Sequence, residues 1–331
     1  MPTSKPGWQD KLLAAWYRGA WWLILLYPVS LLFRFVAAVR KWLYQTGLKT
    51  SWRAPVPVVI VGNITLGGTG KTPVIISLVQ ALQAAGKNVA VISRGYGAAG
   101  PFPHRVTADS RAEQCGDEPL LIYQRTGCVV VAGPKRRLSI EMALREQPID
   151  IVLCDDGLQH YALARDYEIA VLDAARGVGN GWCLPAGPLR EPPSRLQSVD
   201  TVLYRGGSAA DTAVTYQFGA LVNLKTGEQR AFSPASLGES VYALAGIGQP
   251  QQFFDALLAQ GFRPEPHIFA DHHRFTARDL QALGDKPLIM TEKDAVKCRS
   301  FASDKHWFLP ISATLPDGLA EALIALCERE L

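Results

Sequence analysis

Hydrophobic residues recur along most of the chain in two alternating patterns. Short apolar runs rich in β-branched residues are typical of buried strands, and the stretches between them carry apolar residues at helical spacing. The predicted strands are 56–61, 88–93, 128–132, 149–154, 168–172 and 201–204. Helices are predicted between them, for example over 119–125 and 135–147. This alternation indicates an α/β fold with a mostly parallel sheet and helices on both faces.

The pattern weakens after residue 205 and then resumes. Residues 206–217 contain few large apolar side chains, and we interpret them as a connection. A strand, a glycine turn and a helix are predicted again over 241–261. Further strands are predicted at 267–271, 287–294 and 306–311. We therefore expect a core over 49–205 and a smaller α/β lobe over 206–331.

The first 48 residues have a different character. Residues 19–33 are apolar, but Arg18 and Arg34 limit the run to 15 residues and Pro28 interrupts it, whereas a spanning helix needs about 20. Six of the eight tryptophans lie in the first 52 residues, interleaved with Lys and Arg. This combination favours amphipathic helices over 1–48 at a membrane surface, with Pro28 between them. A short spanning helix and a hairpin packed on the protein's own core are the alternatives, and a secretory signal is disfavoured.

Charge is distributed unevenly along the 331 residues. The totals of 34 Lys+Arg and 30 Asp+Glu give a net charge of only +4, yet residues 11–108 hold 11 cations and no acid. A basic front suggests an anionic partner: nucleic acid, a membrane surface or phosphates. Its cations are separated by Trp and Leu at helical spacing, which favours lipid over nucleic acid. Six cysteines without a CxxC pair indicate buried thiols in a reducing compartment.

A glycine-rich turn follows the first predicted strand and precedes a helix, which is the context of a P-loop. The expected nucleotide-binding residues are Thr65, Leu66, Gly67, Gly68, Thr69, Gly70, Lys71 and Thr72. Backbone N–H groups in such a turn surround phosphate oxygens, Lys71 reaches the outer phosphates and the Thr72 hydroxyl can bind magnesium. Thr65 stands where the strict motif has its first glycine, so Gly67 and Gly68 supply the flexibility. We therefore predict a P-loop NTPase-type core that binds ATP with Mg²⁺.

Polar residues follow several of the predicted strands, where parallel sheets place their ligands. Asp155 and Asp156 end an apolar strand, as in a Walker B magnesium site. Arg94 follows the second strand. Asp117 precedes a helix, where an acid can also be a simple cap. Arg136 begins another helix, as a phosphate ligand or as part of a solvated basic face.

Eight motifs in order give the chain a family resemblance. They are VGNITLGGTGKTP, SRGYG, GDEP, DDGLQHY, NGWCLPAGPLRE, AGIGQPQQFF, DHHRF and TEKDAVKC. Together they resemble the tetraacyldisaccharide 4'-kinase family, the lipid A 4'-kinases of Gram-negative bacteria, over nearly the whole chain. The Thr65 departure from the strict P-loop is shared by the family pattern.

The resemblance implies a reaction and a location. The reaction is ATP-dependent phosphorylation of the 4'-hydroxyl of a tetraacylated glucosamine disaccharide 1-phosphate, giving lipid IVA. The implied partners are this amphiphilic lipid A precursor and the inner-membrane surface, with no nucleic acid. The implied location is the cytoplasmic face of the bacterial inner membrane, with the chain attached peripherally.

The resemblance also implies roles for individual residues. Asp117 is the expected proton acceptor, and His272 is expected to pair with it, although the sequence alone equally allows a surface histidine. The expected magnesium group is Thr72, Asp156, Gln159 and Glu191. The expected substrate or phosphate contacts are Asn63, Arg94, Arg136 and Arg190.

A switch-type P-loop ATPase without a lipid substrate is the alternative from another functional class. The division-site ATPases carry a signature lysine just before the glycine pair, and this chain has Leu66 there. Phosphorylation of a tetraacyl disaccharide 1-phosphate separates the two, because a switch hydrolyses ATP without forming the phosphorylated lipid.

Overall fold

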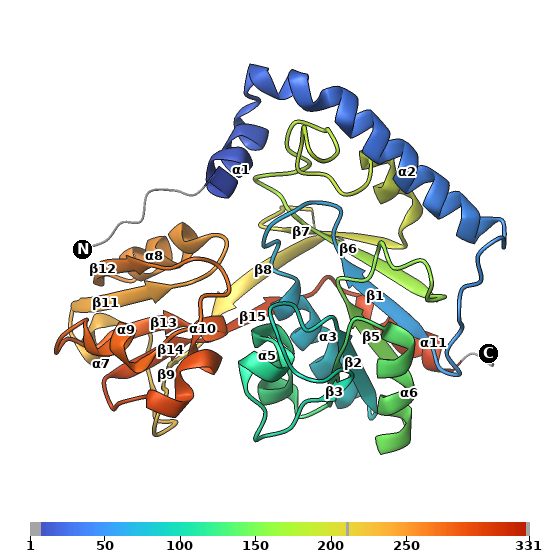
Figure 1. Cartoon of the computed structure of the whole chain (residues 1–331). Coiled ribbons are helices and arrows are strands. Elements are labelled where there is room, and N and C mark those ends of the chain that lie inside the picture. The colour runs from blue at the N-terminus through green and yellow to red at the C-terminus, as the bar shows by residue number, and fades with distance from the viewer. Residues whose placement is uncertain (1–7, 210–211, 329–331) are drawn as a thin grey trace.

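Two β-sheets organise the chain in the computed structural model, which describes residues 8–209 and 212–328 (Figure 1). The larger sheet has nine strands in the order β15-β8-β7-β6-β1-β5-β2-β4-β3. Neighbours from β8 to β4 are parallel, and the edge strands β15 and β3 are antiparallel. Its strands are β1 (Val58–Gly62), β2 (Val89–Ser93), β3 (His104–Arg105), β4 (Val129–Ala132), β5 (Ile151–Asp155), β6 (Tyr167–Asp173), β7 (Thr201–Arg205), β8 (Ala213–Phe218) and β15 (Ile311–Thr314).

Helices cover both faces of the larger sheet, as the sequence predicts. Within β1, Val59 and Val61 pack on one face with α3, α5 and α11, whereas Val58 and Ile60 pack on the other with α6. Successive strand residues point to opposite faces, so continuous apolar runs are what a doubly covered sheet requires. The helices are α3 (Lys71–Ala84), α4 (Ala112–Cys115), α5 (Asp117–Thr126), α6 (Arg136–Glu146), η2 (Pro193–Ser198) and α11 (Leu319–Cys327).

A smaller lobe contains the second sheet, with six strands in the order β10-β9-β14-β13-β11-β12. Its strands are β9 (Leu221–Asn223), β10 (Gln229–Arg230), β11 (Ser240–Ala245), β12 (Arg263–Ile268), β13 (Leu288–Thr291) and β14 (His306–Leu309). Its helices are α7 (Pro234–Leu237), α8 (Pro250–Ala259), α9 (Ala277–Gln281), α10 (Glu292–Cys298) and η3 (Arg299–Phe301). Helix α10 lies at the junction of the lobes, since Val296 packs in the core of the larger sheet and Ala295 in that of the smaller.

The sheets divide the chain differently from the expected boundary at residue 205. Strand β8 includes much of the stretch that we interpret from the sequence as a connection, and the interpretation is wrong there. Val214 is fully buried and Tyr216 packs against the same core, while β8 pairs with β7 and β15, which together fix this strand in the larger sheet. Strand β15 and α11, also beyond residue 205, belong to the larger sheet as well.

The N-terminal segment forms α1 (Trp8–Arg18), η1 (Trp21–Leu26) and α2 (Tyr27–Gln45), with residues 1–7 outside the described part. The helices separate at Gly19, which has a φ of 67°, and not at Pro28. Pro28 lies in the first turn of α2, where no N–H donor is needed. The combined helix Trp21–Gln45 contains an 18-residue window with a mean hydropathy of 2.0, so by length and composition alone it could cross a membrane.

Candidate active site

The P-loop joins β1 to α3 at the carboxyl edge of the larger sheet. Gly70 is the N-cap of α3 with a φ of 83°, a conformation that favours glycine. The Tyr216 hydroxyl, from β8, donates to the Gly70 carbonyl, and a side chain at Gly70 would collide with that ring. The loop is therefore fitted against a strand that lies about 150 residues later in the sequence.

Three further contacts fix the loop, one within it and two from other segments. Buried Asn63 donates from Nδ2 to Thr69 Oγ1 at 3.1 Å, which ties the start of the loop to its end. The Leu66 amide donates to the Pro188 carbonyl at 2.8 Å. From the smaller lobe, Gln249 Nε2 donates to the Gly68 carbonyl at 2.9 Å. The smaller lobe therefore touches the phosphate loop directly.

Three charged side chains meet beside the loop. Lys71 Nζ lies 3.4 Å from Asp156 Oδ1, and Arg190 donates to Asp156 Oδ2 at 2.8 Å. Burial acts to raise the pKa of Asp156, but the charges of Lys71 and Arg190 outweigh it and lower the pKa to about 2. Asp156 also has a φ of 50°, which is uncommon for a residue with a side chain and typical of functional sites. These three residues can bind phosphate and a cation together.

Asp155 lies one residue earlier, at the end of β5, and is the more deeply buried carboxylate. Ser93 Oγ donates to its Oδ2 at 3.0 Å, while its Oδ1 accepts no hydrogen bond. Burial and the nearby carboxylates of Glu118 and Asp156 raise its pKa well above the usual range. The strand-end pattern in the sequence indicates a magnesium site for Asp155 and Asp156 together, whereas the family resemblance assigns the metal role to Asp156 alone.

Glu191 and Gln159 form a network behind these acids. Gln159 Nε2 donates to Glu191 Oε2 at 2.8 Å and to the Asn63 carbonyl at 3.2 Å. Glu191 Oε1 accepts the Tyr161 hydroxyl and pairs with Arg195 Nε at 3.6 Å. Both carboxylate oxygens of Glu191 thus have protein partners, whereas the sequence expectation makes this residue a direct metal ligand.

The donors at this edge of the sheet suit magnesium bound together with phosphate. No group of three or more His, Cys, Asp or Glu within residues 8–209 and 212–328 is arranged to hold a metal alone. Magnesium is usually held by one or two carboxylates, with phosphates and waters completing its shell. One oxygen each of Asn63 and Asp155 is buried without a hydrogen-bond donor, which leaves it available for a cation, and Asp156 Oδ1 faces only the Lys71 ammonium at 3.4 Å.

Asp117 and His272 meet across the two lobes. Asp117 begins α5 in the core and is buried, and His272 comes from the loop after β12. The imidazole Nδ1–H donates to the Asp117 carboxylate, at 3.0 Å from Oδ2 and 3.1 Å from Oδ1. His272 has a φ of 61°, so its backbone is also in the left-handed region. The pairing expected from the family motifs is present in the geometry.

The environment keeps Asp117 ionised. Burial acts to raise its pKa, but the hydrogen bond from His272 and the charges of Lys293 and Lys297 outweigh it, so the pKa lies below the usual range. The same hydrogen bond raises the pKa of His272 despite its partial burial. The pair therefore favours a carboxylate beside an imidazolium.

Sequence reasoning missed the lysines around Asp117. Lys293 Nζ lies 3.0 Å from Glu118, 3.4 Å from Asp271 and 3.8 Å from Asp117. Lys297, one helical turn later in α10, lies 4.0 Å from Asp117 and 2.8 Å from Asp294. Both lysines lie in the motif TEKDAVKC, but the sequence predicts a strand through residue 294, whereas the structure begins α10 at Glu292, and nothing in the motif identifies their partner.

Two expected arginines are placed differently from each other. Arg136 is buried and donates to the backbone carbonyls of Asp155 and Gly133, so it holds the ends of the strands. Arg94 is exposed after β2 and has no ion pair within the part of the chain that the structure describes. Thr72 is half-buried in the first turn of α3.

Comparisons with known proteins agree with one another. A family model described as tetraacyldisaccharide-1-phosphate 4'-kinase matches residues 22–328. A tetraacyldisaccharide 4'-kinase of Pseudomonas putida (strain W619) is 53% identical, with 92% of each chain covered. That of Azotobacter vinelandii (strain DJ) is 52% identical, over 97% of this chain and 98% of the relative. A crystal structure titled as the "apo" form of LpxK from Aquifex aeolicus in complex with ATP superimposes with a TM-score of 0.77 at 26% identity, covering 92% of this chain and 99% of that one.

Proposed function

The chain belongs to the tetraacyldisaccharide-1-phosphate 4'-kinase family, and on that premise we propose how its own residues perform the reaction. As a member it is an ATP-binding kinase of lipid A biosynthesis, which phosphorylates the 4'-hydroxyl of a tetraacyldisaccharide 1-phosphate. Phosphoryl transfer needs little covalent chemistry from a protein, so positioning and charge neutralisation have to supply most of the catalysis.

The edge of the larger sheet is the proposed nucleotide site. The backbone of the loop from Thr65 to Gly70 surrounds the phosphates, with Lys71 and Arg190 neutralising their charge. Thr72, Asp155, Asp156 and Gln159 are the proposed holders of Mg²⁺. When bound there, the ion neutralises charge that develops on the transferred phosphoryl group. Because its oxygens are already engaged, Glu191 acts by orienting Gln159.

Asp117 is the proposed acceptor of the proton from the 4'-hydroxyl. Its low pKa keeps it ionised at neutral pH, and so able to accept a hydrogen bond from the incoming hydroxyl. Such a weak base is sufficient because, in a loose transition state, the bond to the attacking oxygen has hardly formed and the hydroxyl needs little deprotonation. His272 holds the carboxylate in place and compensates its charge. Arg94, exposed after β2, is a proposed contact for a substrate phosphate.

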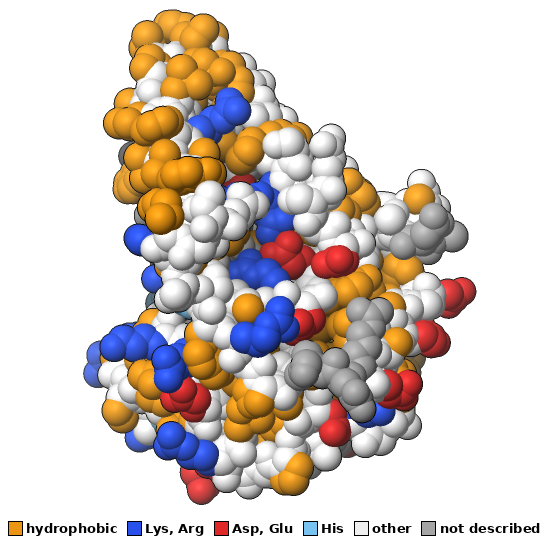
Figure 2. Space-filling view, turned by 90° about the vertical axis from the view of Figure 1, so that its right-hand side faces the viewer, with side chains coloured by type: hydrophobic (Ala, Val, Ile, Leu, Met, Phe, Trp, Pro, Cys, Tyr) orange, Lys and Arg blue, Asp and Glu red, His pale blue; other side chains and the backbone are white. Residues whose placement is uncertain are grey.

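The N-terminal helices are the proposed attachment to the cytoplasmic face of the inner membrane. Large apolar side chains cover their outer surface, including Trp21 at 80% and Phe35 at 66% exposed (Figure 2). Their inner surface is docked on the protein: the Ser30 hydroxyl donates to the Cys183 carbonyl at 2.8 Å, and Leu23 is buried. A helix with one protein face and one apolar face suits the plane of the interface, next to an acylated substrate.

The Asp117–His272 pair, which joins the two lobes, is the observation that carries the proposed mechanism. The test is incubation of the full chain with ATP, Mg²⁺ and tetraacyldisaccharide 1-phosphate, with separation of the lipid products. The expected product carries one additional phosphate on the lipid. ATP hydrolysis without that product would contradict the function and favour the switch-type ATPase.

Sedimentation with vesicles tests the proposed attachment. Replacing exposed Trp21, Leu25, Leu32 and Phe35 with serine should release the protein from vesicles of anionic lipid while ATP binding persists, because each removed side chain contributes apolar burial in the interface. Serine replacement of exposed Leu258 and Ile268 in the smaller lobe is the matched control. Equal sedimentation of both variants with wild type would contradict attachment through this surface.

A further inference from the structure

The ammonium group of one lysine lies close to three acidic residues from two different segments, and one of the three is the proposed proton acceptor, Asp117. Lys293 lies in the first turn of α10 and has only 18% of its side chain exposed. Its Nζ lies within 4 Å of carboxylates from Asp117 and Glu118, at the start of α5, and from Asp271, in the loop that carries His272. Lys293 therefore contacts both segments that supply the pair, one from each lobe.

We propose that Lys293 is a positioning residue for the phosphoryl transfer. Its ammonium group holds Asp117 and the loop that carries His272 at a fixed distance from each other across the junction of the lobes. The inference rests on the proposed roles of Asp117 and His272 and adds the device that sets their geometry and charge. Lysine suits this position because a compact ammonium with three rotatable donors can serve carboxylates that approach from different directions.

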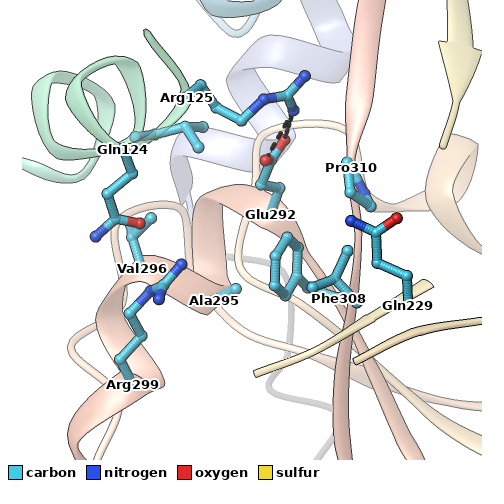
Figure 3. Close-up of a pocket in the computed structure, with 11 residues that line it drawn as sticks. Gln124, Arg125, Gln229, Glu292, Ala295, Val296, Arg299, Phe308 and Pro310 are labelled. Carbon is cyan, nitrogen blue, oxygen red and sulfur yellow. Dashed lines mark hydrogen bonds and ion pairs between the residues drawn. The ribbon is translucent and has the colours of Figure 1, made fainter. Parts of the chain in front are cut away.

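Helix α10 is bound to α5, so the backbone that carries Lys293 has a fixed position relative to Asp117. Arg125, two turns after Asp117 in α5, donates from NH1 to both carboxylate oxygens of Glu292 at 2.8 Å (Figure 3). Arg125 NH2 also donates to Ser312 Oγ at 3.1 Å, in β15 of the larger sheet. These bonds fix the residue before Lys293 to the core, and so define where its ammonium lies relative to Asp117.

The charges around Asp117 determine what removal of Lys293 should do. Asp117 faces His272 and Asp271 from the loop, Glu118 and the Cys115 thiol from its own segment, and Lys293 and Lys297 from α10. Lys293 favours the ionised form of Asp117 and opposes protonation of His272. Its loss therefore raises the pKa of both members of the pair. Lys297 does not replace it, because Lys297 is already paired with Asp294 at 2.8 Å.

The test compares Lys293→Met and Lys293→Arg with wild type, in the full chain, between about pH 5 and 9. For Lys293→Met we expect turnover to fall roughly tenfold or more, with the KM for ATP within about twofold of wild type, because the phosphate loop is untouched. Asp117 stays ionised over this range, so the pair titrates through His272. The alkaline limb of the kcat/KM profile, where His272 loses its proton, should move to higher pH by about one unit, because the lost ammonium no longer opposes protonation of the imidazole. Lys293→Arg keeps the charge and should restore the position of the limb.

Lys286→Met is the matched control, since Lys286 is in the same lobe and pairs with Glu265 at 3.1 Å on an exposed surface. It should match wild type in turnover and in pH profile. Glu118→Gln should shift the profile the other way. It removes a negative charge beside the Asp117–His272 pair but keeps Lys293, so the alkaline limb should move to lower pH. This second variant decides the question if Lys293→Met is too unstable to assay.

The outcomes separate this inference from the proposed function. A purely structural lysine would lower turnover equally at every pH, and an unmoved alkaline limb in both Lys293→Met and Glu118→Gln would overturn the proposal. If Asp117→Asn loses turnover while Lys293→Met behaves like Lys286→Met, only the positioning role is wrong. If Asp117→Asn keeps normal turnover, the proposed proton acceptor is wrong as well.

Discussion

The phosphate edge and the Asp117 cluster are built in opposite ways. The phosphate edge comes mainly from a single unbroken segment, in which β1, eight loop residues and α3 follow one another. The Asp117 cluster takes its members from the start of α5, from the loop after β12 and from α10, over more than 150 residues of sequence. The first offers mainly backbone groups to its ligand, and the second is joined mainly by side chains, although the Glu118 backbone N–H also donates to Asp117.

This difference determines what holds each site together. A loop between a buried strand and a helix keeps its shape through the sheet, and its ligand contacts are N–H groups that every residue provides. The Asp117 cluster depends on the position of the smaller lobe, because His272 and Lys293 reach Asp117 only when the lobes meet. Perturbation of the two sites should therefore separate nucleotide binding from turnover.

The largest effect should come from Asp117→Asn, which removes the proposed proton acceptor but keeps the shape of the side chain. We expect turnover to fall by roughly a thousandfold, since positioned acid–base groups contribute about 100- to 10,000-fold. ATP affinity, measured by calorimetry, should stay within about threefold of wild type because the phosphate loop lies elsewhere. His272→Asn should show the same separation with a smaller loss.

Asp255→Asn is the control for this pair of measurements. Asp255 lies in α8, hydrogen-bonded to Gln251 at 2.8 Å on an exposed surface, and its substitution should change neither quantity. If Asp117→Asn weakened ATP binding as much as it lowered turnover, the phosphate edge and the Asp117 cluster would not act independently, and the comparison between them would be wrong.

The next largest effect should come from Gly70→Ala, which should weaken ATP binding at the phosphate edge. The new methyl group would meet the Tyr216 ring in a backbone conformation with a φ of 83°. We expect ATP affinity to fall by about tenfold or more, as strain of 1–3 kcal/mol distorts the loop. Turnover at saturating ATP should fall less.

Gly227→Ala separates backbone strain from contact with Tyr216. Gly227 has a φ of 76° with nothing within 4 Å of the added methyl group, in the smaller lobe. It should lower stability slightly and leave ATP affinity unchanged. Equal losses of ATP affinity in the two glycine variants would show that the fit against β8 does not matter.

The same contrast explains how much the sequence predicts. The strands near Val61 and Cys154 were predictable because both of their faces are buried, which leaves continuous apolar runs. The phosphate loop was predictable because its chemistry is contiguous. Strand β8 was missed because its pairing with β7 and β15 is tertiary and only Val214 in it is fully buried.

Site residues outside contiguous motifs were harder to predict. Asp117 and His272 were paired only through a family resemblance, since no local pattern relates residues 155 positions apart. Lys293 was missed for the same reason, because its partners lie in other segments. The sequence does not show that the carboxylate oxygens of Glu191 have protein partners, because Tyr161 and Arg195 reach them only in the folded chain.

The smallest effect on turnover should come from Arg125→Met, which loosens the contact between the lobes without removing a charge next to Asp117. Arg125 and Glu292 are 21% and 10% exposed, so the substitution leaves a largely buried carboxylate without its partner. We expect a loss of stability of about 2 kcal/mol, seen as a lower thermal midpoint. Turnover should fall only about threefold, because Lys293, Glu118 and Asp271 still hold the cluster. Glu292→Gln, which removes the buried charge itself, should destabilise less. If Arg125→Met instead lowered turnover as much as Lys293→Met, the lobe junction as a whole, and not the Lys293 ammonium, would set the geometry of the Asp117 cluster.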